Sequence, residues 1–164
     1  MKIIKAMKIK ANYILIPLVV IGIAVAGSWL TDLGMDWYET LELPGYTPSG
    51  GLIGAVWTII FILGVISALL FVNKSARDRH FRRVVWVLCF NGLLNVFWSY
   101  LFFVEHWFSM AILEMMLLNL TTIFLIFLMR KVSRLASGLL VPYFLWVSFA
   151  TYLAYQIWQL NLGV

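Results

Sequence analysis

Residues 37–57 read WYETLELPGYTPSGGLIGAVW. The stretch contains two of the four prolines, Pro44 and Pro48, and two of the eight tryptophans, but no lysine or arginine. A connection this long between packed elements is usually functional or disordered, and the aromatic and proline content favours an ordered structure over a slack linker. We therefore predict that residues 31–51 form a lid, with Trp37, Pro44 and Pro48 as its ordered part.

The amino-acid composition indicates that lipid surrounds most of the chain. Hydrophobic residues make up 63% of the 164 residues and charged residues only 12%, against roughly 45–50% and about 25% in soluble proteins. A soluble domain of this size could not bury so much apolar surface. The composition therefore predicts a single all-α integral membrane domain that covers residues 1–164.

Five apolar segments are long enough to cross a bilayer as helices. A helix rises about 1.5 Å per residue, so roughly 20 residues span the hydrocarbon core. A cleaved signal peptide is the rival interpretation of the first segment, because a lysine-rich start precedes it. Its apolar run is longer than in such peptides, which favours a retained helix. The predicted spans are residues 11–30, 52–73, 84–104, 107–129 and 139–160.

The lysines and arginines predict the orientation of this five-helix bundle. Four of the 12 lie in residues 1–10, five in residues 74–83 and three in residues 130–134, and the other connections have none. Cytoplasmic connections are enriched in Lys and Arg, so five spans put the N-terminus in the cytoplasm and the C-terminus outside. This segregation marks the basic residues as topology signals and argues against a surface for nucleic acid.

The third span has a polar and aromatic face formed by Asn91, Asn95, Trp98 and Phe102, which recur at helical spacing. An amide in hydrocarbon needs a hydrogen-bond partner. One explanation is that both asparagines bond neighbouring helices. The other is that Asn95, next to Trp98 on this face, contacts a ligand.

Two further tryptophans, Trp57 and Trp146, lie inside their spans and not at the ends, where the interfacial aromatic belt is found. A planar ligand requires aromatic faces and a few hydrogen-bonding groups in an apolar cleft. Trp57, Trp98 and Trp146, together with Asn95, would supply such a slot if their faces converge.

Glu114 is the one ionisable group inside a predicted span. Such groups usually face the bundle interior and are functional by default. It is either a protonated carboxyl that bonds an adjacent helix or part of a proton relay. The single cysteine, Cys89, excludes a disulfide or a cysteine-based metal site within one chain, and the sequence has no hydrolase, kinase or metal-enzyme motif.

The order of these motifs resembles the translocator protein / tryptophan-rich sensory protein family (TspO/MBR), in particular a bacterial member. The resemblance covers nearly the whole chain. It rests on Trp37-Tyr38-x-x-Leu41-x-x-Pro44-x-x-x-Pro48, Gly54-x-x-Trp57, Asn91-x-x-x-Asn95-x-x-Trp98 and Pro142-Tyr143-x-x-Trp146-x-x-Phe149-Ala150-Thr151.

The resemblance implies a five-helix bundle in a bacterial cell membrane, commonly a homodimer, with a ligand cavity closed by the first loop. The implied ligands are protoporphyrin IX and other tetrapyrroles, and synthetic isoquinoline carboxamide or benzodiazepine-type drugs; no resident cofactor is required. Carried over by position, the residues that line the cavity are Tyr38, Trp57, Asn95, Trp146 and Ala150.

Several functions stay open at this point. The leading hypothesis is a membrane-embedded protein that binds tetrapyrroles for sensing, transport or light-dependent degradation. If it is an enzyme, Trp57 and Trp146 are the candidate catalytic residues. The alternative is a secondary transporter of a small hydrophobic solute, with Glu114 as the coupling residue. A structural partner that uses its small-residue helix faces would bind no small molecule.

Overall fold

The computed structural model describes residues 11–162, so the prediction that rests on the four lysines of residues 1–10 lies outside the described part. Every regular element within this part is helical, which confirms the all-α prediction. The elements are α1 (Asn12–Leu33), α2 (Met35–Tyr38), α3 (Gly50–Lys74), α4 (Arg79–Ser99), the π-helix η1 (Tyr100–Val104), α5 (Phe108–Arg130), α6 (Arg134–Gly138) and α7 (Val141–Leu160).

Five helical segments in the described residues are long and apolar enough to cross a membrane. The third consists of α4 and η1 together, and the fifth of α6 and α7. Each has a mean hydropathy between 1.4 and 2.7 over its best window. The prediction of five spans is therefore confirmed.

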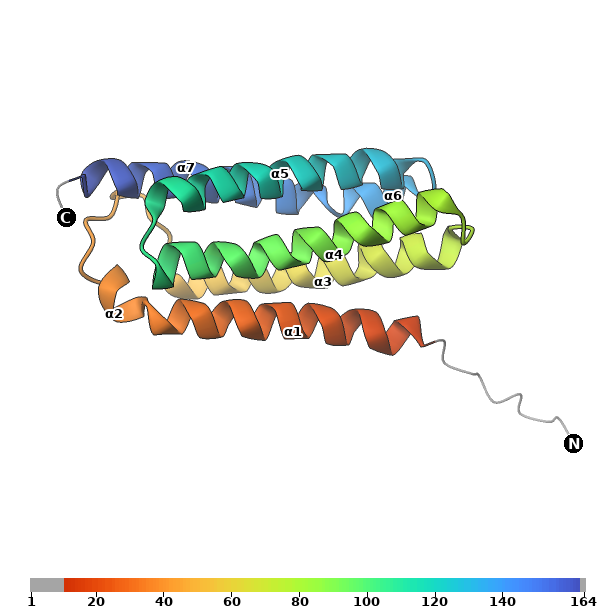
Figure 1. Cartoon of the computed structure of the whole chain (residues 1–164), viewed down its shortest axis with the longest axis horizontal. Helices are drawn as coiled ribbons and strands as arrows, with labels where there is room; N and C mark the ends of the chain where they lie inside the picture. The colour runs from red at the N-terminus through yellow and green to blue at the C-terminus, as the bar shows by residue number, and fades with distance from the viewer. Residues whose placement is uncertain (1–10, 163–164) are drawn as a thin grey trace, which may run out of the picture.

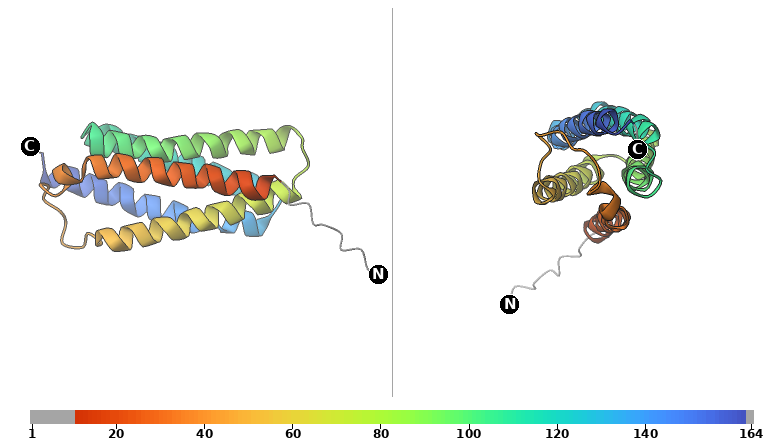
Figure 2. Two further views of the ribbon diagram at one scale, coloured as in Figure 1. Left: turned by 90° about the horizontal axis from the view of Figure 1, so that it is seen from below. Right: turned by 90° about the vertical axis from the view of Figure 1, so that its left-hand side faces the viewer.

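The five spans lie side by side (Figure 1) and, viewed end-on, form a ring that is open between α3 and α7 (Figure 2). Helix α5 packs against α4 and α7, α4 packs against α1, and α1 packs against α3. Helix α3 completes the ring mainly through α6, because its contacts with α7 are sparse. Seen end-on in Figure 2, α3 and α7 stand apart at the end where the 39–49 connection crosses between them.

The two ends of the bundle differ, and we name them by their connections. The loop half carries α2, residues 39–49 and the turn at 105–107, and the basic half carries the connections 75–78 and 131–133. A separate hydrophobic cluster fills each half. The cluster of the basic half consists of Phe71, Val84, Leu125, Leu128, Met129, Ala136 and Leu140.

Local hydrogen bonds explain where the helices depart from the predicted boundaries. Helix α4 begins at Arg79 and not at residue 84, because Asp78 caps it: the Oδ1 atom accepts a bond from the Phe81 N–H at 2.9 Å. Helix α1 continues past residue 30, and the hydroxyl of Thr31 donates to the Gly27 carbonyl at 3.0 Å. Irregular backbone is therefore confined largely to residues 39–49.

Candidate functional site

A cavity of about 470 Å³ lies in the loop half. Helices α1, α2, α3, α4, η1 and α7 contribute to its walls, whereas α5 contributes none of the lining residues. All six residues that the sequence predicted to contact a ligand line it: Tyr38, Trp57, Asn95, Trp98, Trp146 and Ala150. Their convergence is a property of the structure, and their contact with a ligand stays a prediction.

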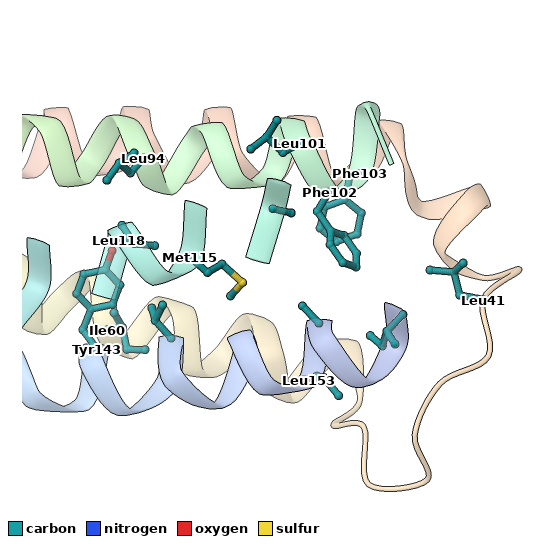
Figure 3. Packing of buried hydrophobic residues seen from close by; sticks show 14 residues of the cluster. Leu41, Ile60, Leu94, Leu101, Phe102, Phe103, Met115, Leu118, Tyr143 and Leu153 are labelled. Atoms are coloured by element: carbon teal, nitrogen blue, oxygen red, sulfur yellow. The ribbon is translucent and has the colours of Figure 1, made fainter. Parts of the chain in front are cut away.

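Aromatic rings form most of the lining beside α4 and η1. Trp98 stacks on Phe102 with ring centroids 5.4 Å apart, and Phe103 meets Trp98 edge-on at 5.7 Å. On the opposite side, Trp146 packs against Phe149 at 5.5 Å. Figure 3 shows Phe102 and Phe103 pointing from η1 toward α7. Such rings present flat apolar surfaces to whatever occupies the space between them.

The π-helix η1 explains how these phenylalanines reach the cavity. A π-helical turn has an i→i+5 bond, here from the Glu105 N–H to the Tyr100 carbonyl at 3.0 Å. The wider turn brings Leu101, Phe102 and Phe103 to the inside in succession, and all three are buried. Short π-helical segments occur frequently at functional sites.

Gly34, between α1 and α2, is required by the close approach of η1. A Cβ atom at this position would overlap the carbonyl oxygen of Phe103. Since the overlap is with backbone, it could not be relieved by a side-chain rotation. Gly34 therefore fixes how α2 and Tyr38 sit over the phenylalanines of η1.

Hydrogen bonds link the cavity to the interior of the bundle. The Asn95 amide donates to the Tyr143 hydroxyl at 3.0 Å, and this hydroxyl donates to Asn91 Oδ1 at 3.0 Å. The Asn91 amide donates in turn to Thr121 and Thr122 of α5 at 2.8 and 3.0 Å. Asn91 thus bonds neighbouring helices, which is the first of the two explanations that the sequence offered for the asparagines of this span. Asn95 does so too, but it also lines the cavity.

Three buried side chains have polar atoms without a hydrogen-bond partner among the described residues. They are the indole nitrogens of Trp98 and Trp146 and both carboxyl oxygens of Glu114. The indoles belong to cavity-lining residues, whereas Glu114 lies on α5, outside the lining. The sequence placed Glu114 correctly in the bundle interior, where it is 6% exposed.

The predicted lid residues do not all lie over this cavity. Tyr38 lines it, and burial raises the pKa of its phenol, which keeps the hydroxyl protonated. Trp37 instead stacks on His106 with ring centroids 3.8 Å apart and lines a second cavity of about 340 Å³ beside Trp158. Pro44 and Pro48 line neither cavity. The role of these three residues in a lid stays a prediction.

Asn161, which sequence reasoning missed, ties the 39–49 connection to the end of α7. The Glu42 N–H donates to Asn161 Oδ1 and Asn161 Nδ2 donates to the Glu42 carbonyl, both at 3.0 Å. Tyr46 stacks on Tyr152 of α7 at 6.3 Å. The available signal was an amide in an otherwise apolar tail, and Asn161 is only 5% exposed.

Comparison with known proteins agrees with this architecture. The model of the TspO/MBR family matches residues 13–159. The uncharacterized membrane protein YtaB of Bacillus subtilis is 38% identical over 84% of this chain and 88% of its own length. The tryptophan-rich protein TspO of Bacillus cereus is 32% identical over 94% of this chain and 100% of its own length.

A more distant relative extends the comparison to animals. The human translocator protein is 28% identical over 87% of this chain and 85% of its own length. The match to the family model, the five apolar helices and the extent of the bacterial similarities lead to one conclusion. This chain is a multi-pass integral membrane protein that belongs to the TspO/MBR family.

Proposed function

We propose that this protein binds tetrapyrroles such as protoporphyrin IX, and similar planar hydrophobic molecules, inside the membrane. The observation that carries the proposal is the convergence of Trp57, Trp98 and Trp146 with Asn95 on one cavity. Its volume of about 470 Å³ lies within the range of small-molecule pockets, roughly 300–1,000 Å³. Isoquinoline carboxamide and benzodiazepine-type drugs are aromatic and apolar as well, so we propose that they compete for this cavity.

Quenching of tryptophan fluorescence by protoporphyrin IX tests this proposal in purified protein. We expect Trp57→Ala combined with Trp146→Ala to weaken binding at least tenfold, because it removes two aromatic surfaces that face the cavity. Trp86→Ala is the matched control, since Trp86 is 75% exposed and does not line the cavity. Equal affinity of the double variant and the control would refute the proposed site.

The proposal includes an orientation for the bundle, with the N-terminus cytoplasmic and the loop half outside. Eight basic residues in the described part lie in or beside the connections of the basic half, where cytoplasmic segments carry them. In a Cys89→Ala background, a maleimide that cannot cross membranes should label Thr40→Cys in intact cells and leave Ala76→Cys unlabelled. Labelling of both positions would contradict the orientation.

The protein could also act on the porphyrin it binds, as an enzyme that degrades the ring in the presence of light and oxygen. The indoles of Trp57 and Trp146 in the cavity lining favour it, because they would lie beside a photoexcited ring. Illumination of the complex in air should then reduce the porphyrin absorbance, and Trp57→Phe with Trp146→Phe should abolish that loss. Binding with stable absorbance in the light would exclude the enzymatic form and leave binding intact.

Transport is the second candidate, and the buried carboxyl of Glu114 without a partner favours it. A relative bears the name translocator protein. If Glu114 couples proton movement to solute movement, Glu114→Gln should abolish uptake into proteoliposomes without changing the affinity for ligand. Uptake that is unaffected by this substitution would show that Glu114 does not couple the two movements.

We also propose that the protein forms a homodimer, which cross-linking in membranes would test.

A further inference from the structure

Charge is distributed very unequally between the two halves of the bundle. The described lysines and arginines all lie on the basic half: Lys74, Arg77, Arg79, Arg82, Arg83, Arg130, Lys131 and Arg134. Five of the seven acidic residues lie on the loop half: Asp32, Asp36, Glu39, Glu42 and Glu105. The half that holds the cavity therefore has a negative field in the described part of the chain.

The residues that line the cavity also include no positive charge and one negative charge. Its lining includes no lysine, arginine or histidine, and the one carboxylate in it is Asp32, near the C-terminal end of α1. The Tyr38 phenol is neutral at ordinary pH, and burial raises its pKa further. The lining therefore offers an anion no opposite charge.

The hydrogen-bond donors in the lining are uncharged, so they do not replace the missing cation. Thr31 donates to the Gly27 carbonyl at 3.0 Å, and Thr58 donates to the Gly54 carbonyl at 2.9 Å. Both hydroxyl protons are thus used within their own helices, whereas the buried indole N–H groups of Trp98 and Trp146 have no partner in the described residues. A carboxylate that entered this space would lose its water and gain no charged partner, which is strongly unfavourable.

We infer that the cavity selects its ligand by charge, with Asp32 as the specificity-determining residue. It accepts the uncharged or cationic edge of a planar apolar molecule and keeps carboxylates outside. This inference rests on the proposed function and ranks its ligands: a tetrapyrrole whose carboxylates are esterified or amidated binds more tightly than the diacid with the same ring. A porphyrin that carries two carboxylates binds with that edge at the mouth, where Asp32 repels it.

A matched pair of ligands tests the inference: protoporphyrin IX, which is a diacid, and its dimethyl ester. The dissociation constants of both are measured by fluorescence quenching in one detergent and at low salt, for each protein variant. The quantity compared between variants is the ratio of the diacid constant to the ester constant. Partitioning of each ligand into detergent is the same for every variant, so it cancels in this comparison.

Asp32→Asn preserves the shape of the side chain and removes its charge, and Asp32→Lys reverses the charge. Two unit charges several ångströms apart in a hydrated mouth interact with about the thermal energy, so we expect the ratio to fall about threefold in Asp32→Asn and about tenfold in Asp32→Lys. The control is Asp78→Asn on the basic half, where asparagine still caps α4. There the ratio should stay unchanged, and salt should reduce the effect at Asp32.

Each outcome of this experiment has a defined meaning. A ratio that is the same in the unsubstituted protein and in both Asp32 variants would overturn charge selection while leaving the proposed function standing. A ratio that Asp78→Asn changes as strongly as Asp32→Asn would overturn the role of Asp32. Absence of quenching by either ligand in the unsubstituted protein would refute the proposed function, and the inference with it.

Discussion

The basic half and the loop half are built from the same five spans and each contains a buried hydrophobic cluster, but the cavity lies in the loop half. In the basic half, Phe71, Val84, Met129 and Ala136 are fully inaccessible to solvent. In the loop half, the spans enclose a cavity of about 470 Å³. Close packing stabilises a bundle through van der Waals contacts. The loop half therefore combines a packed cluster with the cavity that we propose as the ligand site, whereas the basic half is filled by side chains.

Helix α3 shows this division within a single element. Its second half is held by a hydrogen bond of 2.6 Å from the Ser67 hydroxyl to the Ala136 carbonyl and by Asn73, which bonds Asn12 and Tyr13 of α1. Its first half has no buried residue before Ile60. A helix anchored at one end only can make room for a ligand at the other without loss of the fold.

The largest expected effect compares two phenylalanines of α3. Phe71→Ala should lower the free energy of unfolding by about 3 kcal/mol, because it leaves a void in a packed cluster. Phe61→Ala should cost less than about 1 kcal/mol, since Phe61 already borders the cavity. Thermal unfolding in detergent measures both. Equal losses would contradict the difference in packing between the two halves.

A smaller effect is expected at the junction of α1, α2 and η1. Gly34→Ala should cost about 2 kcal/mol, because the added Cβ overlaps the backbone of Phe103. A Cβ atom at Gly22, inside α1, would meet no atom within 4 Å, so Gly22→Ala should be neutral or slightly stabilising. The same unfolding assay compares them, and a neutral Gly34→Ala would show that η1 moves away from α1 without cost.

The smallest effect compares two asparagines at opposite ends of the bundle. Asn161 bonds the 39–49 connection in the loop half, and Asn12 bonds α3 in the basic half. Asn161→Ala removes both bonds to the Glu42 backbone and should destabilise the protein by about 1 kcal/mol. Because it frees the 39–49 connection, ligand dissociation should become several-fold faster in stopped-flow quenching. Asn12→Ala breaks the link to Asn73 on the basic half and should leave dissociation unchanged. Equal dissociation rates in the two variants would show that the 39–49 connection does not slow the release of the ligand.

The spans, and the residues that share one helix face, could be predicted from the sequence for a physical reason, whereas the convergence of the cavity residues is known only from the structure. Uncharged runs of about 20 residues have one stable form in lipid, the helix. Helical spacing then puts Asn95 and Trp98 on one face of α4, and both line the cavity. These two positions follow from local periodicity, which a single sequence displays directly, whereas Tyr38 and Ala150 were expected from the family resemblance alone.

The features that the sequence could not predict depend on contacts between distant segments. The π-helical turn at Tyr100–Val104 differs from an α-helix in which carbonyl accepts each backbone N–H, and the sequence YLFFV does not indicate this difference. Likewise, Gly34 is explained only by the proximity of Phe103, and Asn161 only by that of Glu42. The lid predicted over residues 31–51 stays a prediction: Met35 and Tyr38 of α2 line the cavity, whereas Pro44 and Pro48 do not.

Fluorine NMR of protein labelled with 5-fluorotryptophan tests most directly whether the loop half holds the ligand. The eight tryptophans give resonances that single Trp→Phe substitutions assign. On titration with protoporphyrin IX dimethyl ester, we predict that the signals of Trp57, Trp98 and Trp146 shift together, while that of the exposed Trp86 stays in place. Shifts of Trp86 with unchanged signals from the three cavity tryptophans would contradict the account.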